Sequence, residues 1–241
     1  MFISDTATLA SFCEKLHDAP YLAVDTEFVR ERTYYAELSL VQVAHGSRAA
    51  AIDPLAPGID LEPLRVLLHE PSIVKVFHSG TEDLELLLQL FGELPHPFFD
   101  TQVAASLCGH DAQIGYARLV KQRLGLTLDK ASQRTNWSRR PLTSRQLDYA
   151  LADVTHLCTL YDQLVLELAE RGRTEWVAED MAILGNRQRY EVDPRESWRR
   201  LRARRPTRRS LAILRELAAW RETSAQKRNL PRPWVLKNEV A

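Results

Sequence analysis

The stretch YLAVDTEF (residues 21–28) is an apolar run interrupted by two acids. Its β-branched Val24 and Thr26 favour a buried strand, in which positions two apart share one face, so Asp25 and Glu27 point the same way. Two neighbouring carboxylates on a core strand repel each other and are costly to desolvate. Because no Lys or Arg interrupts the strand, a bound cation is the natural counter-charge.

Outward from this segment, the sequence predicts strands first and helices afterwards. Strands are expected over 2–3, 21–28, 37–44, 49–52, 73–77 and 98–100, and helices over about 4–16, 61–69, 80–91, 101–107, 116–124 and 144–171. The turn residues 45–47 predict that the first three long strands form an antiparallel meander. This order indicates an α/β fold, a mixed sheet covered by helices, followed by a small all-α segment.

Composition indicates a globular protein with enough apolar material for one full core. The chain has 241 residues, 45% of them hydrophobic, and no apolar run near the roughly 18 residues of a membrane span. Residues 1–5 do not form a secretion signal, and three scattered cysteines indicate buried thiols rather than disulfides or a zinc site. We therefore expect a cytoplasmic protein with no membrane partner, and we expect a monomer.

Zero net charge hides a strong polarity along the chain. Residues 1–170 carry 14 basic and 23 acidic side chains, whereas residues 171–241 carry 18 and 9, which gives about −9 and +9. An acidic body with a basic tail is typical of a metal-binding catalytic domain joined to a segment that meets phosphate. The alternative, an Arg-rich solvated helix surface, is equally compatible with the tail taken alone.

Three further residues are expected near the acidic strand. Asp83 lies in the first turn of a helix that follows a strand, where active sites are often built, although an acid there also suits a helix N-terminus. Tyr149 and Asp153 are four apart in a helix and so share one face. Most such pairs are surface features, and this one gains weight only beside Asp25 and Glu27.

Four carboxylates suit a hard divalent cation. Mg²⁺ binds through a few acids together with water and substrate phosphate. Two such ions about 4 Å apart can activate water, hold a scissile phosphate and stabilise the leaving 3′-oxygen. The hydroxyl of Tyr149 can then hold the attacking water in line.

These motifs resemble a known family. Asp25-Thr26-Glu27, His78 with Asp83, and Tyr149 with Asp153 look like the three exonuclease motifs of the DEDD superfamily, Tyr-type branch. The stretches FVRERTYYAELSLVQVA (28–44), FHSGTEDLELL (77–87), FFDTQVAA (98–105) and NWSRRPLTSRQLDYALADVTHL (136–157) resemble bacterial ribonuclease D. The resemblance covers roughly the first 170 residues.

The resemblance implies a ribonuclease-H-like fold and a 3′-to-5′ exoribonuclease that releases nucleoside 5′-monophosphates and trims tRNA precursors and other 3′ extensions. It implies two Mg²⁺ or Mn²⁺ ions. Asp25, Glu27 and Asp153 would ligate the first ion, and Asp25 would bridge to the second. Asp83 would hold the second ion, and Tyr149 would position the water.

The C-terminal stretch 211–239 is similar to the first half of an HRDC domain, a helical nucleic-acid-binding module. The domains expected from the sequence are therefore an exonuclease domain over 1–175, a helical Arg-rich linker over 176–209 and a partial HRDC-like domain over 210–241. The arginines of the tail would attract phosphate in a salt-dependent way. They are Arg199, Arg200, Arg202, Arg204, Arg205, Arg208 and Arg209.

Six residues flanking these motifs are candidates for RNA contact: Phe28, Gln42, His78, Trp137, Arg139 and Arg140. Trp137 could stack a base while the arginines grip phosphate, or it could cover the core beside solvated arginines. Core packing explains Phe28 equally well, and a His that ends a core strand is more often a packed, hydrogen-bonded residue. Tyr34 and Tyr35 are further candidates, whereas Asp100 is expected to cap a helix.

Rival functions remain open at this point. A DNA 3′-to-5′ exonuclease would use the same chemistry on another polymer, and a phosphodiesterase could act on very short oligonucleotides. A non-catalytic RNA-binding scaffold is the third alternative. Clustered negative charge facing a polyanion argues against the scaffold.

Overall fold

The computed structural model describes residues 1–129, 135–201 and 207–238, and the chain divides into two compact units. The first unit comprises Met1–Phe28 and Leu38–Gly185, and the second comprises Val29–Glu37 and Asn186–Ala241. Within the described ranges, no helix is long and apolar enough to cross a membrane. Cys13, Cys108 and Cys158 are buried free thiols, as the sequence predicts.

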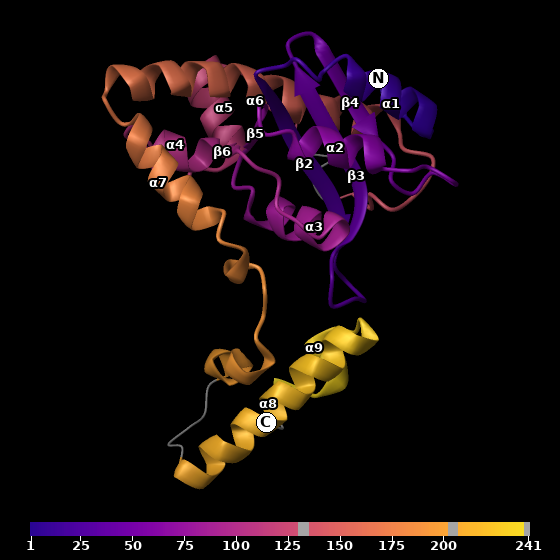
Figure 1. Ribbon diagram of the computed structural model, residues 1–241, viewed down its shortest axis with the longest axis vertical. Helices are drawn as coiled ribbons and strands as arrows, with labels where there is room; N and C mark the ends of the chain where they lie inside the picture. Colours follow the sequence, from indigo (N-terminus) through magenta and orange to yellow (C-terminus); the bar gives the residue numbers. More distant parts are fainter. Residues whose placement is uncertain (130–134, 202–206, 239–241) are drawn as a thin grey trace. The chain divides into compact units, whose positions relative to one another are not determined.

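A mixed sheet forms the centre of the first unit (Figure 1). Its strands are β1 (Phe2–Ile3), β2 (Tyr21–Val29), β3 (Glu37–His45), β4 (Arg48–Ile52), β5 (Val74–Phe77) and β6 (Phe98–Asp100). Their order is β1-β4-β3-β2-β5-β6. Strand β3 pairs antiparallel with β4, whereas β1 with β4, β2 with β5, and β5 with β6 pair in parallel. The long strands β2 and β3 therefore lie at the middle of the sheet.

The first six helices of the first unit follow the pattern expected from the sequence, and α7 (Thr174–Leu184) adds a helix that the sequence assigns to the linker. The first six are α1 (Thr6–Glu14), α2 (Glu62–His69), α3 (Thr81–Phe91), α4 (Thr101–Leu107), α5 (Tyr116–Leu124) and α6 (Ser144–Glu170). Helix α7 crosses residue 175, where the sequence places a domain boundary, and it clusters with the first unit. The α/β class is thus confirmed, and the boundary itself stays a prediction.

The long helix α6 packs on one face of the sheet. Its Val154, Leu157 and Cys158 form a buried cluster with apolar side chains of β2, β3 and β5, namely Tyr21, Ala23, Ala44 and Val76. Further toward its N-terminus, Ala150 joins Leu40, Ala51 and Trp137 in a second cluster. Since side chains alternate along a strand, the face of β2 that carries Tyr21 and Ala23 also carries Asp25 and Glu27. Helix α6 therefore lies over the acidic pair.

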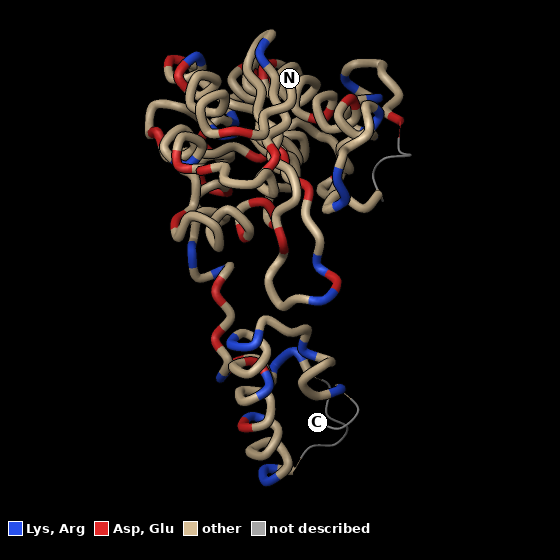
Figure 2. Tube along the Cα trace, turned by 90° about the vertical axis from the view of Figure 1, so that its right-hand side faces the viewer, with Lys and Arg blue, Asp and Glu red and all other residues tan. Residues whose placement is uncertain are grey.

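Beyond residue 185, the described residues of the second unit form helices and turns and no strand. This unit also includes the segment 29–37. It contains short 3₁₀ turns at Arg187–Arg189 and Pro194–Arg200, then α8 (Arg208–Arg228) and α9 (Arg232–Val235), and Lys and Arg recur along it (Figure 2). The Oδ1 atom of Asn229, which ends α8, accepts hydrogen bonds from the backbone N–H groups of Tyr34 and Tyr35, each at 3.1 Å. Of the tail arginines named above, Arg202, Arg204 and Arg205 lie outside the described residues.

Candidate active site

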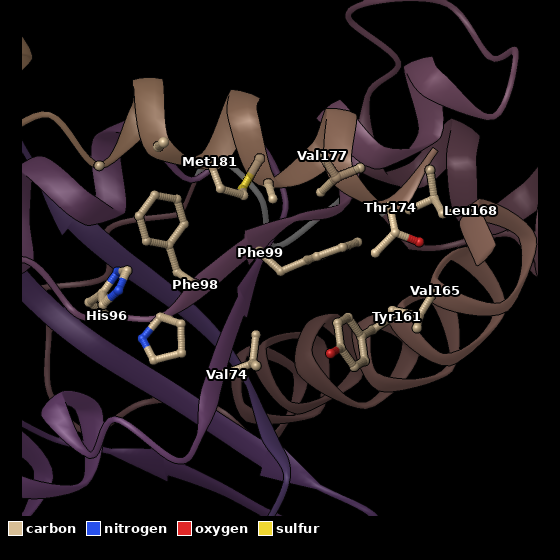
Figure 3. Close-up of a pocket in the computed structure, with 14 residues that line it drawn as sticks. Val74, His96, Phe98, Phe99, Tyr161, Val165, Leu168, Thr174, Val177 and Met181 are labelled. Carbon is tan, nitrogen blue, oxygen red and sulfur yellow. The ribbon is translucent and has the colours of Figure 1, made fainter. Parts of the chain in front are cut away.

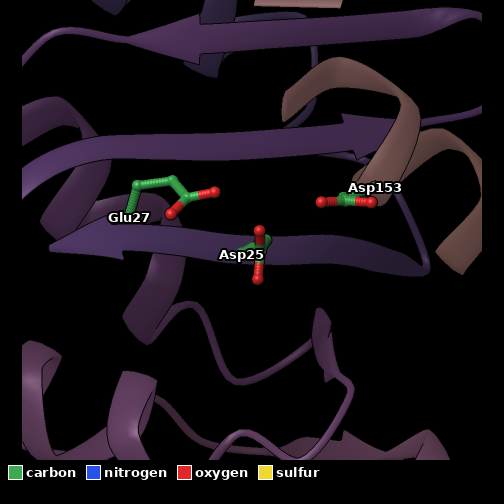
Figure 4. A group of neighbouring side chains, drawn as sticks. All are labelled: Asp25, Glu27 and Asp153. Atoms are coloured by element: carbon green, nitrogen blue, oxygen red, sulfur yellow. The ribbon is translucent and has the colours of Figure 1, made fainter. Parts of the chain in front are cut away.

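Three carboxylates converge where β2 passes beneath α6. One oxygen each from Asp25, Glu27 and Asp153 lie within 4.8 Å of one another (Figure 4). Asp25 and Glu27 come from the same face of β2, and Asp153 comes from the buried face of α6. The structure therefore brings together three of the four acids that the sequence singles out.

Helix α6 is fixed at its start by a capping box. The Oγ1 atom of Thr143 accepts from the backbone N–H of Gln146, and the Gln146 side chain accepts from the backbone N–H of Thr143. Tyr149 follows one turn later and lines the same cavity as Asp25, Glu27 and Asp153. The spacing of four residues thus places the tyrosine hydroxyl at the acidic cluster.

The fourth acid, Asp83, is linked to β2 by a hydrogen bond. The Oγ1 atom of Thr26 donates to Asp83 Oδ1 over 2.5 Å, and Asp83 is only 9% exposed. Thr26 alternates with Asp25 and Glu27 along the strand, so Asp83 is attached to the same strand from its other face. Its negative charge still raises the pKa of Asp25.

A tight turn between β5 and α3 sets the position of Asp83. Ser79 has a φ of 56°, and a Cβ on Gly80 would lie 2.5 Å from the Cβ of Phe77, so the turn needs glycine there. The carboxylate of Asp100 accepts from the N–H groups of Ser79 and Gly80 at 3.0 and 2.9 Å. It also caps α4 by accepting from Gln102 N at 2.8 Å, so the structural role expected for Asp100 is present.

The acids of the cluster hold their protons far more tightly than free carboxyls do. Burial raises the pKa of Glu27 to about 8, with further contributions from the charges of Asp153 and Asp83. Burial raises the pKa of Asp153 to about 7 and that of Asp83 to about 6. The pKa of Asp25 lies well above its ordinary value because of burial and the three neighbouring charges. The site therefore carries more negative charge than the protein itself compensates.

A cavity of about 220 Å³ opens onto this cluster. It is lined by Asp25, Thr26, Glu27, His78, Tyr116, Tyr149, Asp153 and Leu157. A second cavity of about 210 Å³ shares Tyr116, Tyr149 and Asp153 with it. Since the described residues that line the first include neither Lys nor Arg, its carboxylates are accessible to a cation from outside. Oxygen donors in this number fit a hard divalent ion such as Mg²⁺.

Tyr116 is a site residue that sequence reasoning missed. Its hydroxyl donates to the backbone carbonyl of Asp153, and its ring packs edge-on against His78 with centroids 5.3 Å apart. In the sequence it is only the first residue of a predicted helix. No local pattern links it to Asp153, which lies 37 residues further along.

Two of the RNA-contact candidates lie at the cavity or beside it. Phe28 is half-buried and directly follows Glu27 on β2. His78 lines the cavity, with Nδ1 at 3.0 Å from Thr101 Oγ1 and Nε2 at 3.1 Å from the Ile114 carbonyl. Both ring nitrogens of His78 are thus engaged by the protein, which agrees with the packed, hydrogen-bonded alternative.

The other four candidates differ in exposure. Gln42 is fully buried on β3, and neither atom of its amide has a hydrogen-bond partner among the described residues. Trp137 is 3% exposed and belongs to the core cluster under α6, and the Arg140 guanidinium is paired with Asp53. Only Arg139 is exposed. For Gln42, Trp137 and Arg140 the geometry therefore favours an interior role over direct RNA contact.

A larger apolar cavity of about 490 Å³ lies between β6, α6 and α7 (Figure 3). Its lining includes Phe98, Phe99, Tyr161, Val177 and Met181, contains no carboxylate, and shares no residue with the acidic cavity. Its size alone does not make it the reaction site, because its described lining offers no carboxylate to hold a metal ion.

Comparison with known proteins agrees with this site. The model of a 3′-5′ exonuclease family matches residues 1–169, and the chain belongs to that family. An HRDC domain model matches residues 210–240. Ribonuclease D of Zymomonas mobilis subsp. mobilis is 50% identical over 241 residues, which are 99% of this chain and 61% of that protein. The resemblance to bacterial ribonuclease D inferred from the motifs is thereby confirmed.

Solved structures give the same picture. The crystal structure of Escherichia coli RNase D, described as an exoribonuclease involved in structured RNA processing, matches with a TM-score of 0.90 and 41% identity over 99% of this chain and 64% of that one. Brucella melitensis NrnC bound to pGG matches with a TM-score of 0.68 and 29% identity over 80% of this chain and 91% of that one. The ribonuclease-H-like exonuclease fold is confirmed, and the family implies dependence on divalent metal ions. The chain spans about 61% of the length of the curated relative above.

Proposed function

We propose that this chain is a 3′-to-5′ exoribonuclease that releases nucleoside 5′-monophosphates from RNA 3′ ends, with tRNA precursors and other 3′ extensions as its substrates. The observation that carries the proposal is the convergence of Asp25, Glu27 and Asp153 within 4.8 Å at an open cavity whose described lining offers no Lys or Arg to neutralise them. The likeness to ribonuclease D supports the choice of RNA.

The carboxylates fit two divalent ions, Mg²⁺ or Mn²⁺. Asp25, Glu27 and Asp153 would hold one, and Asp25 with Asp83 would hold the other. When bound, such ions supply positive charge that offsets the carboxylates and the charge developing on the phosphate and the leaving oxygen. Without bound cations the anionic forms of these acids are destabilised, and their pKa values are raised for that reason.

Tyr149 is suited to hold the attacking water. Burial and the nearby acids raise the pKa of its phenol, so the hydroxyl stays neutral at any working pH. A neutral phenol can donate one hydrogen bond to a neighbouring carboxylate and retains lone pairs that accept one from water. The oxygen of that water is thereby oriented beside the acidic cluster, and orientation of this kind lowers the barrier.

Binding of the RNA body is assigned to exposed basic residues. Arg139 precedes α6 and faces solvent, and Arg208 and Arg209 are exposed at the start of α8. Contacts of this type attract phosphate without reading sequence, and they weaken as salt rises. The cytoplasmic location and the monomeric state stay predictions.

The deciding experiment uses RNA labelled at its 5′ end, digested with Mg²⁺ or with a chelator. The proposal predicts a ladder shortened one nucleotide at a time, with nucleoside 5′-monophosphates released, only when the metal is present. A DNA oligonucleotide of the same sequence runs in parallel, because only RNA offers a 2′-hydroxyl. Preferred digestion of DNA would favour the DNA exonuclease, and no digestion of either polymer would favour the scaffold.

One observation favours a second candidate, a phosphodiesterase for very short oligonucleotides. The structural neighbour NrnC is solved in complex with pGG, a dinucleotide. Measuring kcat/KM for a dinucleotide and for an RNA of about 20 nucleotides distinguishes the two functions. Our proposal expects the longer RNA to be the better substrate, and a strong preference for the dinucleotide would replace it with the second candidate.

A further inference from the structure

The Arg140 guanidinium is completely occupied by the protein. Its Nε and Nη2 atoms donate to the two carboxylate oxygens of Asp53 at 2.7 and 2.6 Å, in the planar fork typical of arginine. Nη2 also donates to the Ser39 carbonyl at 2.6 Å. Nη1 donates to the carbonyls of Trp137 and Arg139 at 2.7 and 3.0 Å. All five N–H groups are therefore used.

These contacts tie three parts of the first unit together. Ser39 lies on β3, Asp53 directly follows β4, and Trp137 and Arg139 belong to the segment that leads into α6. Asp53 is nearly buried, with 7% of its side chain exposed, against 26% for Arg140. A bidentate pair at this depth has little freedom to rearrange, so it fixes the backbone carbonyl of Trp137 relative to the sheet.

Trp137 carries this constraint to the active site. Its side chain packs with Leu40, Ala51 and Ala150 and is 3% exposed. The ring of Tyr149 packs against the same cluster, with its centroid 6.1 Å from that of Trp137. The tyrosine ring therefore lies between a fixed indole and the acidic cavity that its hydroxyl enters.

We propose that Arg140, held by Asp53, is a positioning residue for Tyr149 and acts through Trp137. The proposal rests on the exoribonuclease function proposed above. The sequence Trp-Ser-Arg-Arg (137–140) suggests an RNA contact, yet its two arginines have different roles. Arg139 faces solvent, and Arg140 sets the geometry of the tyrosine that orients the water.

The test compares Arg140→Lys with Arg65→Lys, a matched change on α2, where Nε and Nη2 of Arg65 also donate to both carboxylate oxygens of one acid, Glu62, at 2.7 and 2.6 Å. Both keep the charge, but a lysine ammonium cannot form the planar fork or reach all four carbonyl and carboxylate partners. We expect Arg140→Lys to lower kcat by about tenfold, with KM within about twofold, because small misplacements of a catalytic group cost one to two orders of magnitude. We expect Arg65→Lys to leave kcat unchanged.

A double-mutant cycle with Tyr149→Phe separates positioning from general structural damage. If Arg140 acts through the tyrosine hydroxyl, Arg140→Lys costs about tenfold in the wild-type background and less than about twofold once that hydroxyl is gone. An equal loss of kcat in both backgrounds would overturn the proposal. A kcat of the Arg140→Lys variant equal to that of the wild-type protein would also overturn it.

A second variant covers the case in which Arg140→Lys does not fold. Trp137→Phe keeps an apolar ring, and the indole N–H that it removes has no partner among the described residues. It should lower kcat in the same direction and show the same non-additivity with Tyr149→Phe, and additive losses would overturn the proposal. If the wild-type protein itself shows no Mg²⁺-dependent cleavage, the function falls and the positioning role falls with it. If it cleaves and only the cycle is additive, the positioning role alone is rejected.

Discussion

Two buried acidic sites in this molecule are built on opposite principles. In the second unit, Glu222 is 1% exposed and is gripped by Arg232, whose Nε and Nη2 each donate at 2.6 Å, and by the Tyr34 hydroxyl. Burial alone would raise the pKa of Glu222, but these hydrogen bonds outweigh it and lower the pKa. Among the described residues of the first unit, no Lys or Arg pairs with Asp25 or Glu27, and the pKa values of these acids rise.

The difference shows how a structural carboxylate is told from a functional one. A buried carboxylate that a protein cation neutralises has a structural role, and no net charge remains there to attract a ligand. A buried cluster that the protein leaves uncompensated is unfavourable until a ligand supplies the missing charge. The contact of Tyr34 with Glu222 thus holds segment 29–37 against α8, whereas the carboxylates around Asp25 are suited to bind metal ions.

The largest expected effect comes from removing the shared acid. Asp25→Asn should lower kcat/KM for RNA by at least about 10³-fold, since it removes charge that serves both metal ions and several kcal/mol of transition-state stabilisation. Folding and RNA binding should stay nearly intact, as measured by circular dichroism and by filter binding. Substantial residual cleavage by this variant would contradict the assignment.

The matching change in the other site should affect stability and not catalysis. Glu222→Gln leaves the Arg232 guanidinium without its counter-charge, and it should lower the free energy of unfolding of the second unit by about 2 kcal/mol, because the partly exposed arginine is rehydrated in part. Urea unfolding followed by hydrogen exchange of α8 measures this. Cleavage of RNA should stay within about threefold, and a loss like that of Asp25→Asn would erase the distinction between the sites.

The hydroxyl of Thr26 offers a finer test of the metal site. Thr26→Val removes the hydrogen bond that keeps the pKa of Asp83 from rising further, and it should raise the Mg²⁺ concentration for half-maximal activity by about tenfold. Thr26→Ser retains the hydroxyl and serves as the control. Equal Mg²⁺ dependence of the two variants would remove Asp83 from the metal site.

The two sites should also give opposite pH signatures in the metal-free protein. Glu27 and Asp153 have folded-state pKa values raised to about 8 and about 7, so the folded state holds protons that the unfolded state has lost, and stability falls as pH rises from about 4 toward 8. We expect Tm to drop by at least about 10 °C over this range and Mg²⁺ to abolish the drop.

Glu222 has a lowered folded-state pKa, so its contribution is present above its unfolded value of 4.5 and is lost as pH falls through the folded one. The stability difference between wild type and Glu222→Gln should therefore shrink below pH 4.5. A metal-free Tm that instead rises between pH 5 and 8 would contradict the account of the acidic cluster.

The sequence predicts those parts of the site that local periodicity encodes. Alternation along a strand places Asp25 beside Glu27, and helical spacing places Tyr149 beside Asp153, which the structure reproduces. The partnership of Arg140 with Asp53, 87 residues earlier, has no local signature. In the sequence alone, an arginine beside a tryptophan is equally compatible with RNA contact and with an interior role. Only the fold shows that Arg140 has the interior role.

The same limit applies to the packing around the acids. Tyr116 reaches the Asp153 carbonyl, and Thr26 reaches Asp83 across 57 residues, through contacts that depend on how distant elements meet. The fold class was accessible because strands and helices each follow a repeating pattern of apolar residues. Tyr34 and Tyr35 in segment 29–37 are candidates for nucleotide contact from the sequence alone, yet the Tyr34 hydroxyl donates to Glu222.

Anomalous diffraction from crystals soaked in Mn²⁺ tests the central claim most directly. The account predicts strong anomalous density enclosed by the carboxylates of Asp25, Glu27 and Asp153, and its disappearance in Asp25→Asn. Density that avoids these three residues, or a lysine or arginine side chain found occupying their centre, would contradict it.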